Sequence, residues 1–179
     1  MKVYERNEIA TIISNIKEPY KIEFSIRMLL ENKLVSDKEM LELIKIILNT
    51  KNYYQARHAY IVGSNSTAYE SGKIIELTKI VSSCEKNYQI EYSSLVARAK
   101  QVIDSGKAVE LTKIVSKSPT EEIAINTANV ARNFDILDSK YAIGLTKLTK
   151  DGIKPDTIYK LLNILENQNK KPKILKIAK

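Results

Sequence analysis

A block of eleven residues occurs twice in this chain of 179 residues, 34 positions apart. Residues 72–82 have the sequence GKIIELTKIVS, and residues 106–116 have the sequence GKAVELTKIVS. Further steps of 34 reach related segments at 140–149, 38–47 and 4–13. The most regular column of residues 34 apart contains Ile9, Leu43, Leu77, Leu111 and Leu145. A fixed period of this length is typical of stacked supersecondary units, so we predict five copies of one unit.

Each copy has the hydrophobic spacing of two helices. In residues 72–82, Ile74, Leu77 and Val81 fall on one side at about 100° per residue, as in an amphipathic helix. The second half of each copy carries another apolar stripe that is rich in small residues, which suits close helix packing. No segment alternates with period two over the length of a strand. We therefore predict an all-α fold of about ten helices in five two-helix repeats, arranged as a right-handed superhelical α-solenoid or a compact curved bundle.

Capping residues and prolines predict several helix boundaries. Residues 36–39, Ser-Asp-Lys-Glu, predict a capping box at the start of a first helix. Residues 118–121, Ser-Pro-Thr-Glu, predict a cap, a first-turn proline and a capping-box glutamate at the start of a second helix. Pro19 and Pro155 occupy the same position four periods apart. The connections from each second helix to the next first helix are predicted to be loops or short helical turns, at 63–71, 99–105 and 133–139.

Composition limits the class of protein. The hydrophobic content of 44% and the charged content of 28% are ordinary for a soluble protein. The one cysteine, Cys84, excludes an internal disulfide framework and is compatible with a reducing cytosol. The sequence has no signal-peptide core and no apolar run that approaches a membrane span. We expect a cytoplasmic protein with one α-solenoid domain at 1–167 and a basic C-terminal cap or tail at 168–179.

The positive charge is concentrated at the C-terminal end. The net charge is +8. From Lys147 onward, nine lysines and three acidic residues give +6, which leaves 20 basic and 18 acidic residues, or +2, for the rest. This asymmetry supports an alternative hypothesis, in which a nucleic acid binds through Lys147, Lys150, Lys154, Lys170, Lys171 and Lys173. In residues 168–179, the apolar Ile174, Leu175 and Ile177 favour a cap on the last repeat over a free basic arm.

One lysine recurs in each of the last four copies, at Lys45, Lys79, Lys113 and Lys147. Stacked helices would align these lysines in a stripe that could follow a phosphate backbone. The glutamates three residues earlier, Glu42, Glu76 and Glu110, favour a different interpretation. In it, each lysine forms a solvated i,i+3 ion pair within its own helix. Lys147 lacks such a glutamate, because Gly144 takes its place.

An aromatic ladder follows the second helices of the first three copies. Its members form i,i+4 pairs: Tyr20 with Phe24, Tyr54 with His58, and Tyr88 with Tyr92. Either the ladder is an exposed ridge that binds a protein partner or a second copy, or it is a second core face of these helices. The fourth and fifth copies carry polar residues at these positions. That change favours binding, since an architectural requirement should recur in every copy.

The sequence carries no diagnostic motif for catalysis or metal binding. His58 is the only histidine and Cys84 the only cysteine, which argues against a zinc site and a Cys–His nucleophile pair. The segment 63–66 lacks the lysine spacing of a phosphate-binding loop. We therefore predict a non-enzymatic protein–protein interaction scaffold with no cofactor, no metal and no membrane association. A homo-oligomer is compatible with this prediction.

The period and the helix pairs resemble the α-solenoid class, which includes HEAT-like, tetratricopeptide and pentatricopeptide repeats. The tetratricopeptide length agrees, but the Trp, Gly-Tyr and terminal Pro positions of that family have no counterpart in register. Residues 142–162, with the sequence KDGIKPD at 150–156, are similar to the inter-repeat segment of pentatricopeptide proteins. That similarity implies binding of single-stranded RNA, one base per repeat. The other copies lack the segment, so the resemblance implies an architecture and transfers no functional residues.

Overall fold

The computed structural model describes residues 3–32 and 34–170, which form thirteen α-helices and no strand. This confirms the predicted all-α class. The first helix of each copy, here called an A helix, is α1 (Val3–Ser14), α3 (Asp37–Leu48), α6 (Ile74–Ser82), α9 (Ala108–Val115) or α12 (Ala142–Lys150). The second helix, here called a B helix, is α2 (Pro19–Glu31), α4 (Tyr53–Gly63), α7 (Asn87–Ala97), α10 (Glu121–Ala131) or α13 (Pro155–Lys170).

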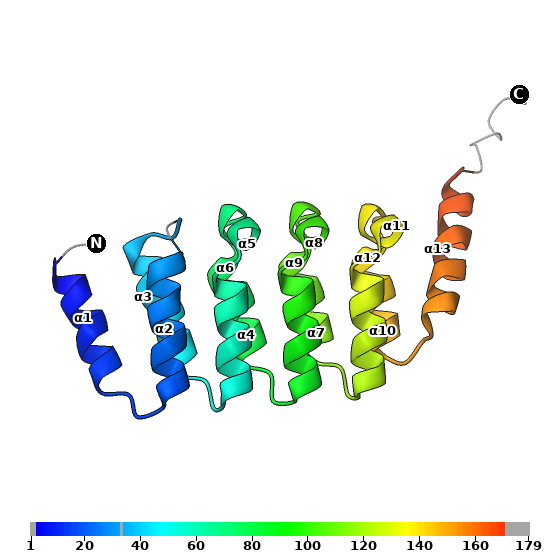
Figure 1. Cartoon of the computed structure of the whole chain (residues 1–179). Helices are drawn as coiled ribbons and strands as arrows, with labels where there is room; N and C mark the ends of the chain where they lie inside the picture. Colours follow the sequence, from blue (N-terminus) through cyan, green and yellow to red (C-terminus); the bar gives the residue numbers. More distant parts are fainter. Residues whose placement is uncertain (1–2, 33, 171–179) are drawn as a thin grey trace, which may run out of the picture.

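The helix pairs stand side by side in chain order, with α1 and α2 at one end and α13 at the other (Figure 1). The helix α4 packs against α2 and α7, the B helices on either side of it, and against α6, the A helix that follows it. The A helices α3, α6, α9 and α12 likewise contact one another in succession. The main contacts therefore join each repeat to its immediate neighbours.

Three short helices increase the number of helices from about ten to thirteen. They are α5 (Ser66–Glu70), α8 (Lys100–Asp104) and α11 (Phe134–Asp138), and they occupy the segments predicted as loops or short turns. The Asn65 and Asn133 side chains accept hydrogen bonds from the first turns of α5 and α11. One residue of each short helix is fully buried, in a column formed by Ala68, Val102 and Ile136. Repeats two to four therefore contain three helices, not the predicted two.

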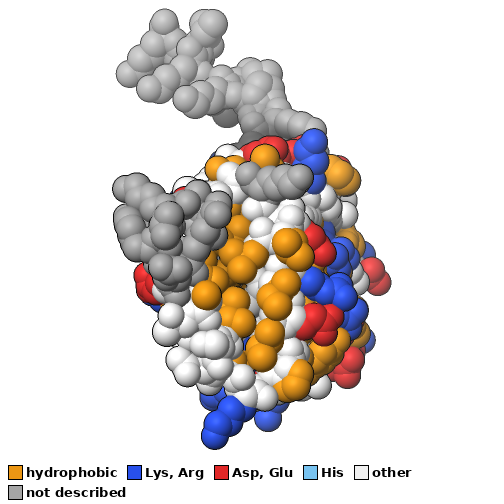
Figure 2. All heavy atoms as spheres, turned by 60° about the vertical axis from the view of Figure 1, so that its left-hand side comes forward, with side chains coloured by type: hydrophobic (Ala, Val, Ile, Leu, Met, Phe, Trp, Pro, Cys, Tyr) orange, Lys and Arg blue, Asp and Glu red, His pale blue; other side chains and the backbone are white. Residues whose placement is uncertain are grey.

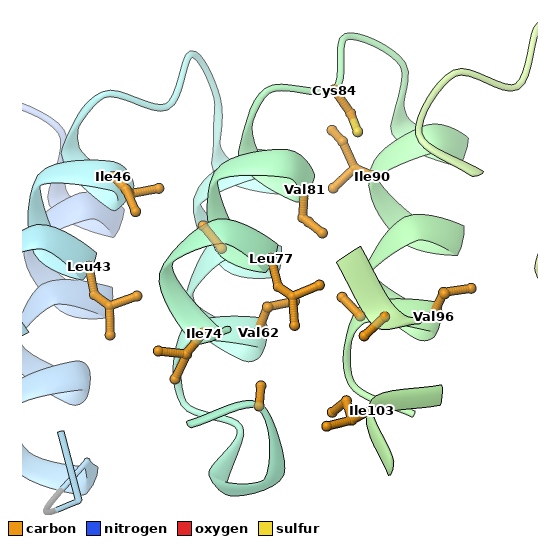
Figure 3. Close-up of a cluster of buried hydrophobic side chains, with 14 of the residues drawn as sticks. Leu43, Ile46, Val62, Ile74, Leu77, Val81, Cys84, Ile90, Val96 and Ile103 are labelled. Carbon is orange, nitrogen blue, oxygen red and sulfur yellow. The ribbon is translucent and has the colours of Figure 1, made fainter. Parts of the chain in front are cut away.

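The leucine column lies in the interior. Leu43, Leu77 and Leu111 are fully buried, and Ile9 and Leu145 are each 3% exposed. Figure 3 shows Leu43 and Leu77 among the side chains of a core cluster that continues through successive repeats. Leu145 belongs to a second cluster, formed by α10 to α13. The burial of this column is what the 34-residue period predicted, because equivalent hairpins cover one another's apolar faces.

The predicted boundaries hold at some helices and fail at others. Ser36 and Glu39 form the predicted capping box of α3, and Pro19 and Pro155 are the first residues of α2 and α13. The prediction for residues 118–121 was wrong, because α10 begins at Glu121 and Thr120 is its cap. The last helix, α13, extends to Lys170, across the boundary predicted between 167 and 168. The remaining tail, residues 171–179, lies outside the described residues.

Candidate protein-interaction surface

The aromatic ladder lies along the B helices α2, α4 and α7. Phe24 and His58 are buried, with 5% and 8% exposure, and the four tyrosines, Tyr20, Tyr54, Tyr88 and Tyr92, are half-buried. The predicted pairing within a helix is present in α4, where the Tyr54 and His58 ring centroids lie 4.6 Å apart. The ladder is therefore neither a freely exposed ridge nor an entirely internal face.

Two ladder tyrosines connect successive repeats through their hydroxyl groups. The Tyr54 hydroxyl donates to Glu91 Oε2 on α7 at 2.8 Å, and the Tyr88 hydroxyl donates to the Pro119 carbonyl before α10 at 2.7 Å. Burial, together with the hydrogen bond to Glu91, raises the pKa of Tyr54 to about 12. The Tyr54 phenol therefore stays protonated and remains a donor at neutral pH. These two residues contribute to the joints between repeats as well as to the surface.

A second repeated hydrogen bond was missed in the sequence analysis. Gln55 Nε2 donates to the Cys84 carbonyl at 2.7 Å, and Gln89 Nε2 donates to the Ser118 carbonyl at 2.9 Å. The two donors, Gln55 and Gln89, are 34 residues apart, and so are the two acceptors, Cys84 and Ser118. The repeat period could therefore have predicted that both bonds occur. The Cys84 side chain is buried, and burial raises the pKa of its thiol. Cys84 therefore has a structural place in this joint between repeats.

The most exposed aromatic ring of the B helices, Tyr53, is not a member of the ladder. Its ring lies 5.8 Å from that of Tyr20 and 5.5 Å from that of Phe24, and it is 52% exposed. The Tyr60 ring stacks on Phe24 at 5.4 Å, and the Tyr60 hydroxyl donates to Glu31. We call Tyr20, Phe24, Tyr53 and Tyr60 the aromatic cluster. The i,i+7 spacing of Tyr53 and Tyr60 on α4 could have revealed it, but only the i,i+4 pairs were followed.

The recurring lysines form ion pairs between repeats, so the predicted i,i+3 pairing was wrong. Three of the four lysines, Lys45, Lys79 and Lys113, each reach a glutamate 37 residues earlier, on the preceding A helix. The N–O distances are 3.0 Å for Lys45–Glu8, 2.5 Å for Lys79–Glu42 and 2.8 Å for Lys113–Glu76. Stacking places the acid of one A helix beside the base of the next, which the spacing within one helix does not reveal. These pairs neutralise the stripe that could have followed phosphates.

The C-terminal lysines are only partly described. Lys147 lies with Glu110 and Asp151 around a pocket of about 400 Å³, and Lys150 forms an ion pair with Asp151 at 2.7 Å. Lys154 is exposed. The Lys170 side chain and the residues Lys171 and Lys173 fall outside the described side chains. Carboxylates accompany two of the described lysines, and nucleic-acid binding stays a prediction.

His58 is held as a neutral ring in the core between α4 and α7. Its Nδ1 has no hydrogen-bond partner among the described residues, and burial, followed by the nearby Arg57, lowers the pKa of the imidazole. No three His, Cys, Asp or Glu side chains in 3–32 and 34–170 converge in the way that metal ligands do. The candidate site thus consists of the aromatic ladder, the aromatic cluster and the hydrogen bonds that fix their tyrosines.

Comparisons with known proteins give no relative for this architecture. No protein-family model, curated protein or solved structure matches the chain. Within the described part of the chain, none of the helices combines the length and the apolar character needed to cross a membrane. Any assignment of function must therefore rest on the surface of the molecule itself.

Proposed function

We propose that this protein is a non-enzymatic scaffold of the α-solenoid class, with a right-handed, HEAT-like superhelix, that binds a protein partner in the cytoplasm. The observation that carries the proposal is the aromatic cluster on α2 and α4. Its four rings form a chain of contacts: Tyr53 contacts Tyr20 and Phe24, and Phe24 also stacks on Tyr60, while half of the surface of Tyr53 remains exposed. An exposed aromatic anchor supported by fixed neighbours is typical of the energetic centre of a protein interface.

The cluster has the surroundings of a binding site. Glu23 and Arg27 form an exposed ion pair at 2.9 Å on α2, beside Phe24 in the sequence. Arg57 is exposed one helical turn after Tyr53 on α4. Protein interfaces commonly place such charged groups on the rim, where they remain solvated, around an aromatic centre that loses its water. Tyr53 would therefore provide most of the affinity, and the charged residues would select the partner.

Aromatic residues occupy the ladder positions in the first three repeats only. The ladder positions in α10 and α13 are Glu122, Asn126, Asp156 and Lys160, and each of the first two repeats also contributes to the aromatic cluster. A requirement of helix stacking alone would apply to all five B helices. The restriction supports one partner site at the N-terminal end of the row, formed by α2, α4 and the half-buried tyrosines of α7.

The experiment compares two exposed aromatic residues. Tagged wild type, Tyr53→Ala and Phe134→Ala are used to capture partners from a lysate of the source cells, and a captured protein is then purified and titrated directly. Phe134 is a suitable control because it is 66% exposed but lies on α11, outside the cluster. We expect Tyr53→Ala to weaken binding at least tenfold and Phe134→Ala to leave it within twofold. A partner that binds all three proteins equally would contradict the proposed site.

A further inference from the structure

The C-terminal end exposes positions that other repeats bury. On the B helices, Met28, Val62, Val96 and Val130 are fully buried, whereas Ile164 in the same column is 52% exposed. On the A helices, Ile46 and Ile114 are 9% and 7% exposed and Ile80 is half-buried, whereas Leu148 in the same column is 41% exposed. The earlier B helices pack against the A helix that follows, but no such helix follows α13 in the described residues. We call Leu148 and Ile164 the C-terminal end face.

The N-terminal end exposes a different set of columns. Ser94, Ala128 and Leu162 are at most 4% exposed and Tyr60 is half-buried, whereas Ile26 in the same column is 43% exposed. On the A helices, Ile44, Thr78, Thr112 and Thr146 are fully buried, whereas Ala10 is exposed. In Figure 2, which brings the N-terminal end forward, hydrophobic side chains gather on this end of the molecule. We call Ala10 and Ile26 the N-terminal end face.

The two end faces are the two halves of one joint. Tyr60, in the column of Ile26, stacks on Phe24 of the preceding B helix, so this column faces backward along the row. Met28, in the column of Ile164, lies close to Gly63 and Ser64 of the next repeat, so that column faces forward. Each joint between successive repeats brings a forward column against a backward column. Ile164 and Leu148 face forward but have no following repeat to pack against among the described residues. A second copy of the chain could provide the missing backward-facing side chains, because its N-terminal end exposes Ala10 and Ile26.

Charge supports the same partner. Joints between repeats pair a glutamate of one A helix with a lysine of the next. The glutamate column, Glu8, Glu42, Glu76 and Glu110, ends with Gly144, and the lysine column, Lys45, Lys79, Lys113 and Lys147, begins with Thr11. Bringing the C-terminal end of one copy against the N-terminal end of another therefore buries neither an unpaired acid nor an unpaired base at this position.

We infer that this protein associates head to tail with itself, the C-terminal end face of one copy packing on the N-terminal end face of the next. The contact is heterologous, since different surfaces meet, and it leaves one free face at each end of a pair. Association therefore continues beyond dimers as the protein concentration rises. The exposed anchor of the proposed partner site, Tyr53, belongs to neither end face, so this inference does not depend on that site.

Two charged substitutions test the inference. Ile26→Asp blocks the N-terminal end face and Ile164→Asp blocks the C-terminal end face, both at exposed positions. Sedimentation velocity over a wide concentration range should show growing species for the wild type and monomers for each variant. An equimolar mixture of the two variants should give dimers and nothing larger, because one intact face of each kind remains. Phe134→Asp, in a column whose other members, Ser66 and Lys100, are also exposed, should behave as the wild type.

Several outcomes would overturn the inference. The first is a wild type that is monomeric at every concentration, or a variant mixture that stays monomeric. The second is loss of association in only one of the two variants, which would indicate a different contact surface. A monomeric wild type whose melting temperature falls with Ile164→Asp but not with Ile26→Asp would show that α13 is covered by a segment of the same chain. Circular dichroism of each variant verifies that its helices are intact.

Discussion

The interior and terminal repeats carry the same columns in different surroundings. Val96 and Ile164 occupy equivalent positions on B helices, yet Val96 is fully buried and Ile164 is half exposed. The third repeat, residues 72–105, also forms ion pairs and glutamine–carbonyl hydrogen bonds across both of its boundaries. A single hairpin of this kind buries only part of its apolar surface, and its neighbours bury the rest. A residue's contribution to stability should therefore depend on its repeat as much as on its type.

The largest difference is expected between an interior core leucine and a terminal one. Leu77→Ala removes a fully buried side chain and should lower the free energy of unfolding by about 2 to 5 kcal/mol. Leu148→Ala, at a position 41% exposed, should cost less than about 1 kcal/mol. Urea denaturation followed by circular dichroism measures both. Equal losses would contradict the contrast between interior and terminal repeats.

Two helical glycines should respond to alanine with opposite signs. A Cβ at Gly63, in an interior joint, would lie 2.8 Å from Met28 Cε and 3.1 Å from Leu43 Cδ2, so we expect a loss of about 1 kcal/mol. A Cβ at Gly144 would meet no atom within 4 Å, so the better helix propensity of alanine should add about 1 kcal/mol. Thermal denaturation of both variants is the measurement. The contrast fails if Gly63→Ala is also stabilising.

Removing one hydroxyl from an interior joint should have a smaller effect. Tyr88→Phe deletes the donor to the Pro119 carbonyl, and we expect a loss of about 1 kcal/mol in the free energy of unfolding. Tyr53→Phe is the control, because its exposed hydroxyl donates to no other described residue. The urea midpoint of Tyr88→Phe should be lower than that of Tyr53→Phe. A Tyr88→Phe protein as stable as the wild type would show that the bond does not hold the joint.

The pH dependence should reveal the neutral His58 in its interior joint. Burial lowers the pKa of the folded imidazole below the value of 6.5 expected for the unfolded chain. As the pH falls through 6.5 toward the folded pKa, the unfolded state binds more protons, so stability declines. Above this window the contribution is constant. His58→Phe, which introduces the residue type found at Phe24, should remove this part of the decline in urea midpoints between neutral and mildly acidic pH. If the urea midpoints of His58→Phe and the wild type depend on pH in the same way, the predicted role of His58 is wrong.

The smallest effect is expected for the lysine column. Lys79→Met breaks an exposed ion pair with Glu42 and should cost at most about 0.5 kcal/mol, with less effect at high salt. Lys147→Met removes a lysine that has no ion pair within 4 Å among the described residues and should change stability even less. Thermal melts of both variants at low and high salt make the comparison. A large loss for Lys79→Met would mean that these pairs act cooperatively along the row.

The sequence was sufficient to predict what depends on one repeat. The period predicted the buried leucine column, and helical spacing predicted the A and B helices. The capping box at Ser36 needed only four residues. The short helices α5, α8 and α11 were harder, because five residues give too little periodicity and their buried residues become visible only in the core.

The predictions that were wrong or incomplete concern contacts between repeats. The recurring lysines were paired with glutamates of their own helix, since the distance between stacked A helices is not written in any one of them. The aromatic ladder was followed along single helices, so the contact of Tyr53 with Tyr20 and Phe24 was missed. Pro119 was placed inside α10, whereas it precedes the helix and accepts a hydrogen bond from Tyr88. Each of these errors concerns a neighbour that sequence spacing alone does not supply.

The ion pairs that join each A helix to the preceding one have a consequence for how such a chain can change its length. Lys45, Lys79 and Lys113 each find a glutamate 37 residues earlier, one period plus three. Deleting or duplicating an interior block of 34 residues would give each of these lysines an equivalent glutamate from the new neighbour. Insertions of other lengths would break the register. Gene rearrangements in whole units could therefore lengthen or shorten this protein while keeping its joints.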